Sequence, residues 1–399
     1  MIREGFRDFV NRTLTLQCDS RIEKFSLKCH IHEDREMAYV APWIRNAVEH
    51  GITEMDISIK PHFEPGELLA NIKTHREVSL SREFFTSKTL VKLTLGTRFT
   101  LEKLPPDVSL LALKSLFIDS IHFQYEDLCY VLLPGYPVLE DLVVRHKDYE
   151  ALPCRISSQT IKRISVHYDC EFEIGSISSM AFDVPSLVSL DYSDCALPEY
   201  ITVNLESLVE ARLDLRCTKN VWIPDVWGLF YGIRNVETLH LTPNSVDVIS
   251  QCLRDGIPLP VFNNLVNLSC GSKNKRSWKL LPYLLEQCPK LQTLIIQNLI
   301  GYTGDFYIPM HQVKFNNLEM DGYTTDVDIP LNQVKVLHIL CYRGTAQELK
   351  RLKSLLRGRN CVELVRVEIA QGVGVDDGKI LQTLGVSVSS KCKTEVEIF

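Results

Sequence analysis

The sequence lacks any long uninterrupted apolar run. A membrane-spanning helix needs about 18 or more consecutive apolar residues, and the apolar stretches here, such as the one near 130–133, stop after a few residues. The first residues, MIREGFRDFVNRT, carry charges and contain no apolar core of a signal peptide. We therefore expect a soluble chain that has no membrane partner.

An excess of basic residues is also absent. The chain has 44 Lys and Arg against 50 Asp and Glu, a formal net charge of -6, so it offers little attraction to phosphate backbones. One basic cluster, Lys273, Lys275 and Arg276 beside Trp278, forms a single short loop and not an extended basic face. We expect no nucleic-acid partner.

Motifs for metal and phosphate chemistry are missing as well. His30 and His32, followed by Glu33 and Asp34, could offer ligands, but no CxxC or HExxH completes a site. The stretch GVGVDDGK at 372–379 differs from a phosphate-binding loop in its glycine spacing, in its missing Ser or Thr and in its two aspartates. We expect no enzyme, no cofactor and no metal site.

Thirteen cysteines are spread through 399 residues without the dense spacing of a small secreted protein. This distribution indicates a reducing compartment, the cytoplasm or the nucleus, with free thiols. Most cysteines fit as small core side chains, so cysteine catalysis is not expected. Cys195 in particular is expected to react slowly with thiol reagents and to form no disulfide.

What the sequence does contain is a recurring pattern, apolar-x-x-apolar-x-apolar. Its matches are separated by 26 residues on average, within the 20 to 29 of leucine-rich repeats, although single intervals range from 19 to 38. The matches begin at Ile22, Ile52, Leu90, Leu113, Leu139, Ile161, Leu187, Leu208, Val236, Leu265, Leu291, Phe315, Val334 and Leu364, those at Ile22, Ile52 and Phe315 being weaker.

Alternate side chains of a strand point to opposite faces, so the fourth and sixth positions of each repeat enter the core. The pattern predicts an α/β fold, a curved leucine-rich-repeat solenoid with a parallel sheet on its concave side and helices and irregular returns on its convex side. Helical returns are expected near 38–49, 126–133, 246–254, 278–287 and 346–357, and an irregular one at 170–183. The residues predicted to be buried include Leu90, Leu93, Leu95, Leu187, Leu190, Leu291, Leu294 and Ile296.

The ninth repeat position carries a small polar residue in two repeats, Cys195 and Asn244. Such a side chain can bond backbone groups where the chain turns away from the strand. Most other repeats have a different residue there, so the repeats are degenerate.

Several stretches resemble a known family, the plant F-box proteins with leucine-rich repeats and a C-terminal FBD region. They are FRDFVNRTL at 6–14, WIRNAVEHGITEMDI at 43–57, YPVLEDL at 136–142, LESLVEARLDL at 205–215, VKVLHILCYRGTAQELKRLKSLL at 334–356 and SSKCK at 389–393. The resemblance implies a solenoid over 1–330 and an FBD-like region over 331–399 that continues it. It also implies a substrate receptor of an SCF-type ubiquitin ligase, whose F-box docks on a Skp-type adaptor while the repeats capture a target protein.

The F-box itself, a helical module of about 45 residues in that family, is not visible in this chain. The expectation is that the chain binds a Skp-type adaptor only if an F-box is encoded upstream of Met1. Two functions therefore remain open: the target-binding part of a ubiquitin ligase, and a recognition solenoid that acts without a ligase.

Outward-facing fifth positions of six consecutive repeats should stand in one row across the sheet. Two members of this row, Phe117 and Val143, are apolar although their outward-facing positions do not pack in the core. Together with polar neighbours they resemble a binding hot spot. The alternative is that a loop or the N-terminal segment covers them. The partner-binding row predicted from the sequence is Phe117, Val143, Ser165, Asp191, Arg212 and His240.

Overall fold

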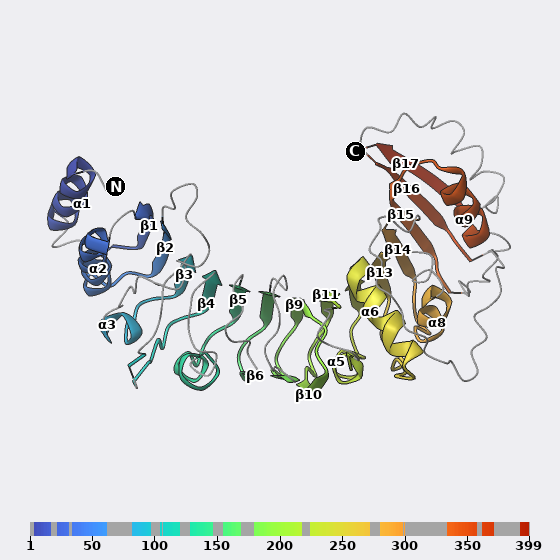
Figure 1. The fold of residues 1–399 in the computed structure, drawn as a ribbon, viewed down its shortest axis with the longest axis horizontal. Coiled ribbons are helices and arrows are strands. Elements are labelled where there is room, and N and C mark those ends of the chain that lie inside the picture. Colours follow the sequence, from blue (N-terminus) through green and yellow to red (C-terminus); the bar gives the residue numbers. More distant parts are fainter. Residues whose placement is uncertain are drawn as a thin grey trace. The chain divides into compact units, whose positions relative to one another are not determined.

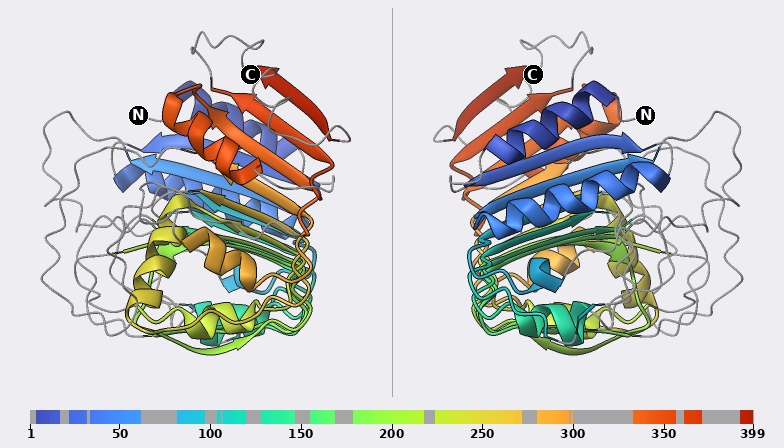
Figure 2. Two further views of the ribbon diagram at one scale, coloured as in Figure 1. Left: turned by 90° about the vertical axis from the view of Figure 1, so that its right-hand side faces the viewer. Right: turned by 90° about the vertical axis from the view of Figure 1, so that its left-hand side faces the viewer.

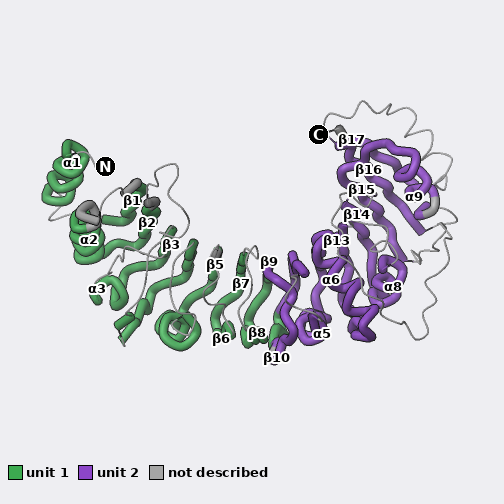
Figure 3. The backbone as a smooth tube through the Cα atoms, in the orientation of Figure 1, with its two compact units in different colours: residues 1–190, 204–207 green, residues 191–203, 208–399 purple. Residues whose placement is uncertain are grey.

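A computed structural model of the chain divides into two compact units, shown in Figure 3. Unit 1 comprises residues 1–190 and 204–207, and unit 2 comprises residues 191–203 and 208–399. The structure describes residues 4–16, 22–31, 34–61, 82–96, 104–105, 107–119, 128–146, 155–168, 179–217, 224–271, 280–297, 299, 333–356, 361–370 and 392–398.

Parallel strands at the repeat positions dominate both units (Figure 1). In unit 1 they follow the chain in the order β1 (Lys24–Ile31), β2 (Glu54–Pro61), β3 (Lys92–Gly96), β4 (Ser115–Asp119), β5 (Asp141–His146) and β7 (Arg163–Tyr168). In unit 2 the order is β11 (Glu210–Arg216), β12 (Thr238–Leu241), β13 (Asn267–Gly271), β14 (Thr293–Gln297), β15 (Val336–Tyr342), β16 (Leu364–Ile369) and β17 (Lys393–Ile398). Strand β9 (Ser189–Cys195) contains the division between the units. The predicted leucine-rich-repeat solenoid is confirmed.

Burial alternates along these strands as the repeat pattern predicts. In β4 and β14 the second and fourth residues are buried while the others are half-buried. All eight residues predicted to be buried are at most 3% exposed. Each of these apolar side chains contributes about 1.5 to 3 kcal/mol when fully buried, so the stacked strands supply the core that a single strand lacks.

The frame of one repeat differs from the prediction. Leu364 is the register partner of Val336, which is the third residue of the repeat that begins at Val334. Leu364 is therefore also a third residue, so its own repeat begins at Val362 and not at Leu364. Because the shift is two residues, the side-chain parity is unchanged and Val367 and Ile369 are buried as expected. Strand β17, which pairs with β16, is a further repeat strand that the pattern missed, because its core positions include Thr394.

Helices cover one face of the strands, which we call the covered face. In Figure 2, α2 runs beside β1 and β2, and α6 packs against β11, β12 and β13. The expected helical returns are confirmed as α2 (Asp34–Glu49), α6 (Pro243–Arg254), α8 (Leu280–Glu286) and α9 (Ala346–Leu356). The return expected at 126–133 is instead a π-helical turn, Leu128–Leu132, followed by a 3-10 turn, Leu133–Gly135.

Local capping determines where two of these helices begin. Thr242 is the N-cap of α6, where its hydroxyl accepts a hydrogen bond from the Ser245 N–H, and Pro243 is the first helical residue. Before α9, Thr345 and Glu348 form a capping box: Glu348 N–H donates to Thr345 Oγ1 and Thr345 N–H donates to Glu348 Oε2.

Several elements had no counterpart in the sequence prediction. Helices α1 (Glu4–Leu16), α3 (Arg82–Phe85) and α5 (Trp227–Gly232) are additional. In unit 1, β6 (Arg155–Ser157) and β8 (Ser179–Asp183) pair in a second, smaller sheet, and β10 (Glu199–Asn204) is a further additional strand. The prediction of an irregular return at 170–183 is therefore wrong for its last five residues, because β8 pairs in parallel with β6 there.

Some predictions concern residues outside the described ranges. These are the repeat at Phe315, the basic cluster at 273–278, the glycine stretch at 372–379, the side chains of the His30 to Asp34 group, and the boundary near residue 330. Among the described helices, none is both long enough and apolar enough to span a membrane.

Candidate functional site

The face of the strands opposite the helices, which we call the open face, carries the predicted partner-binding row. In unit 1, Phe117 on β4 is the register partner of Val143 on β5, and Val143 is the register partner of Ser165 on β7. Neighbouring strands lie about 4.8 Å apart. All three side chains are half-buried and so keep part of their surface accessible. The structure thus brings these three predicted residues together.

In unit 2, Arg212 on β11 is the register partner of His240 on β12. Burial and the neighbouring Arg212 lower the pKa of His240, while Glu210, whose Oε1 lies 3.5 Å from Nε2, acts in the opposite direction. The imidazole is therefore neutral at pH 7. Asp191 lies half-buried on β9. In unit 1, three members of the row therefore form one group. In unit 2, Arg212 and His240 are neighbours, and Asp191 lies on β9.

A residue that the sequence analysis missed completes the group in unit 1. The guanidinium carbon of Arg145 lies 5.4 Å from the centre of the Phe117 ring, in a cation–π contact. Arg145 is exposed and follows Val143 by two residues on β5, so it points to the same face. The sequence could have identified Arg145, because it occupies the seventh position of its repeat and that position faces outward like the fifth. We call Phe117, Val143 and Arg145 the β4/β5 cluster.

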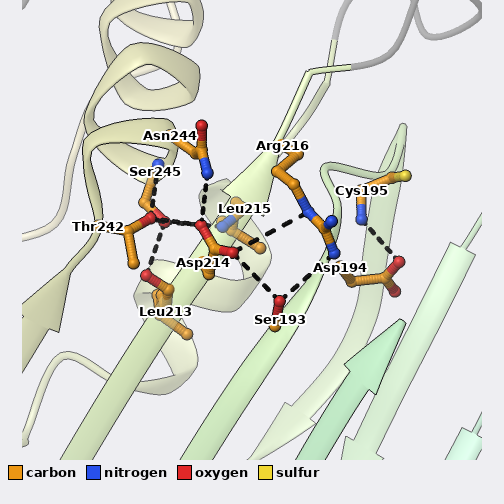
Figure 4. A network of polar contacts seen from close by, with 10 residues as sticks. All are labelled: Ser193, Asp194, Cys195, Leu213, Asp214, Leu215, Arg216, Thr242, Asn244 and Ser245. Atoms are coloured by element: carbon orange, nitrogen blue, oxygen red, sulfur yellow. Dashed lines mark hydrogen bonds and ion pairs between the residues drawn. The ribbon is translucent and has the colours of Figure 1, made fainter. Parts of the chain in front are cut away.

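Polar contacts in unit 2 converge on Asp214 of β11 (Figure 4). Its Oδ1 accepts hydrogen bonds from Thr242 Oγ1 at 2.6 Å and Asn244 Nδ2 at 2.8 Å, and its Oδ2 accepts one from Ser193 Oγ at 3.2 Å. Burial alone would raise the pKa of Asp214, but the hydrogen bonds, first those from Thr242 and Asn244, lower it overall. The carboxylate thus joins β9, β11 and the start of α6 and carries a negative charge at neutral pH.

At the ninth repeat position, Asn244 donates a hydrogen bond to the Asp214 carboxylate. Ser245, one residue later, bonds the backbone: its Oγ donates to Leu213 O at 2.8 Å and accepts from Leu215 N at 2.7 Å. The first turn of α6 buries this serine completely against β11. The predicted backbone bond of the ninth-position side chain stays a prediction.

A second carboxylate in unit 2, that of Asp194, is almost entirely buried. Its Oδ2 accepts a hydrogen bond from Tyr192 Oη at 2.8 Å and its Oδ1 accepts one from Cys195 N at 2.6 Å. Burial raises the pKa of Asp194 to about 7, although both hydrogen bonds act in the opposite direction. The position is internal, so we treat Asp194 as a structural residue and not as part of a binding surface.

The cysteines correct one prediction. Cys195 is disulfide-bonded, so the expectation of a free thiol there is wrong. Free thiols are found at nine described cysteines. Burial raises the pKa of Cys252, Cys270 and Cys288 to about 12, which leaves them protonated and poorly nucleophilic at neutral pH.

Comparison with known proteins agrees with this architecture. A family model described as the LRR repeats of the FBD-associated F-box protein At5g56370 matches residues 40–207. The F-box/LRR-repeat protein At3g60040 of Arabidopsis thaliana is 51% identical over 406 residues, which cover 98% of this chain and 82% of the relative. The chain belongs to the plant F-box/LRR-repeat family.

Two further members of the F-box/LRR-repeat family show the same relationship. The Arabidopsis thaliana protein At1g06630 is 47% identical over 372 residues, covering 92% of this chain and 82% of the relative. The putative F-box/LRR-repeat protein At3g44810 is 37% identical over 387 residues, covering 96% of this chain and 81% of the relative. Membership in this family indicates a role in protein interaction, the general use of repeat solenoids.

Proposed function

We propose that the chain is a target-binding solenoid of an SCF-type cullin-RING ubiquitin ligase, with no catalytic activity of its own, acting in the cytoplasm or the nucleus. The observation that carries the proposal is the apolar pair formed by Phe117 and Val143 on the open face of unit 1. Solvent-reachable apolar side chains that are neighbours on a sheet are typical of protein-binding hot spots. The names of the relatives, which join an F-box to leucine-rich repeats, support the ligase part of the proposal.

Target capture is tested with the double substitution Phe117→Ser and Val143→Ser. Proximity labelling of the intact protein in plant cells, with proteasomal degradation blocked, identifies captured proteins. We expect the double variant to lose them while its melting temperature falls by no more than a few degrees, since both side chains are only half-buried. A fall of many degrees would identify the pair as core, and a stable variant with normal capture would place the binding surface elsewhere.

The ligase part is tested separately with the Skp-type adaptor. We expect the 399-residue chain alone not to co-purify with the adaptor and a version extended by an F-box from a relative to do so. Stoichiometric co-purification of the unextended chain would contradict this expectation. If the extended version binds the adaptor but no target becomes ubiquitinated, the second candidate, a recognition solenoid without a ligase, is favoured.

A further inference from the structure

The β4/β5 cluster combines an apolar surface with a cation. Phe117 and Val143 form the apolar part, and along the same row Thr94 is the register partner of Phe117 on one side and Ser165 that of Val143 on the other. The apolar area is therefore two strands wide and ends at small polar side chains. It has room for one apolar side chain of a partner and not for a long apolar segment.

Arg145 differs from the other arginine on this part of the open face. Arg163 on β7 is neutralised by Asp141, with 2.5 Å between Nε and Oδ1 and 2.6 Å between Nη2 and Oδ2. Arg145 has the cation–π contact with Phe117 and, within the described part of the chain, no ion pair. Asp119 on β4 is the register partner of Arg145. Because Arg145 has no ion pair among the described residues, its charge is available there to attract a carboxylate of a partner.

A guanidinium in a cation–π contact is still suited to bind a carboxylate. The contact with the Phe117 ring is an attraction between the charge and the ring and needs no N–H donor, so it is compatible with a bidentate hydrogen bond from the same guanidinium to a carboxylate. The contact with Phe117 also restricts the side chain before binding, which lowers the entropy lost on association. A carboxylate bound there would lie next to whatever apolar side chain occupies the surface of Phe117 and Val143.

We propose that the β4/β5 cluster selects target segments in which an apolar side chain is followed or preceded, within two residues, by Asp or Glu. The apolar side chain packs on Phe117 and Val143, and the acidic side chain pairs with Arg145. A segment with Lys or Arg at that place is rejected by like-charge repulsion and by the uncompensated guanidinium. This inference rests on the proposed function, since it specifies what the same surface recognises.

The experiment uses the full 399-residue chain and a random dodecapeptide phage library as the probe. Enriched sequences are resynthesised with a fluorescent label, together with versions in which each Asp or Glu is replaced by Lys, and their Kd values are measured by fluorescence polarisation. We expect enrichment of apolar residues with a nearby acidic residue. We also expect about tenfold weaker binding of the Lys versions, which corresponds to about 1.4 kcal/mol.

Charge variants test the role of Arg145. Arg145→Gln should remove the preference for acidic peptides, and Arg145→Glu should reverse it, while the conservative Arg145→Lys should keep part of it. Arg45→Glu, at an exposed arginine on helix α2, is the matched control and should leave every Kd unchanged. Thermal melting of each variant verifies folding, and Arg145→Gln, which introduces no new charge, gives the test if Arg145→Glu is unstable.

The outcomes separate this inference from the proposed function. Peptides that require Phe117 and Val143 but bind equally well with Asp or Lys would overturn the acidic selectivity and leave the binding surface in place. An acidic preference that persists in Arg145→Gln would also overturn the inference. If no peptide is enriched, or if the Phe117→Ser and Val143→Ser variant binds the enriched peptides normally, both the inference and the proposed surface are wrong.

Discussion

The hydroxyl of Thr242 donates a 2.6 Å hydrogen bond to Oδ1 of Asp214, although the two residues are 28 positions apart in the chain. Thr242 also caps helix α6, so the same side chain links the start of a return helix to the strand of the preceding repeat. Repeat proteins gain stability from contacts between neighbouring repeats. In unit 2 part of this coupling is polar and converges on one carboxylate.

Replacing Asp214 by Ala should strongly destabilise unit 2. The substitution leaves Thr242, Asn244 and Ser193 without their shared acceptor, and hydrogen bonds to a charged group contribute about 1.5 to 3 kcal/mol each. We expect the free energy of unfolding in urea to fall by at least about 2 kcal/mol. A double-mutant cycle with Thr242→Ala should give a coupling energy of about 1 kcal/mol or more. Additive effects of the two substitutions would show that the hydrogen bond contributes nothing.

Acid should weaken the same network. The pKa of Asp214 is lowered in the folded state, so its contribution is fully present above the ordinary aspartate pKa of about 3.9 and is lost as the pH falls through the lower folded-state value. Urea midpoints measured between pH 6 and pH 3 should therefore fall less steeply in Asp214→Asn than in the unsubstituted chain. Parallel curves for the two proteins would contradict this assignment.

Asp194 should have the opposite pH dependence. Its pKa is raised to about 7 in the folded state, mainly by burial, whereas the unfolded chain loses this proton near pH 4. Between these values unfolding releases a proton, so stability falls as the pH rises from about 4 to about 7 and then levels off. Asp194→Asn should remove this part of the pH dependence, and Asp8→Asn, at an exposed position on α1, is the control. An unchanged dependence in Asp194→Asn would refute the raised pKa.

Thiol labelling should separate the cysteines into three groups. Cys341 and Cys361 are exposed and should react quickly in the native protein, whereas Cys270 and Cys288 are buried and should react only after unfolding. Cys195, which is disulfide-bonded, should react only after both unfolding and reduction. Mass spectrometry of peptides alkylated before and after reduction gives the assignment, and alkylation of Cys195 without reductant would show that the bond is absent in solution.

Two glycine substitutions should have opposite effects. A Cβ atom at Gly232 of α5 would overlap the Val203 side chain on β10, whereas one at Gly5 of α1 would have no atom within 4 Å. Gly232→Ala should therefore cost about 1 to 3 kcal/mol, as overpacking usually does. Gly5→Ala should stabilise α1 by about 0.5 to 1 kcal/mol, because alanine loses less backbone entropy in a helix. Similar melting temperatures for the two variants would mean that α5 does not pack tightly on β10.

The sequence by itself determined which residues of each repeat are buried. Leu93, Leu190 and Leu294 lie in the core because a strand alternates its side chains, and this alternation depends only on local backbone geometry. The repeat that begins at Val362 follows the same principle. Its start was predicted two residues too late, and an error of two residues keeps the buried side chains on the correct face of the strand. Residues without this periodicity, such as those of β8 and α5, were not predicted, since their structure depends on contacts with distant segments.

Only the tertiary structure decided which polar side chains meet. Three contacts each join different repeats: the cation–π contact of Arg145 with Phe117, the ion pair of Arg163 with Asp141 and the hydrogen bond from Asn244 to Asp214. The repeats are irregular, with spacings from 19 to 38 residues, so positions in the sequence do not fix which outward residues become neighbours. Strand register fixes them, and register follows from backbone pairing and from how each return packs. Hydrogen bonds and cation–π contacts require distances accurate to a fraction of an ångström, whereas burial requires only the correct face.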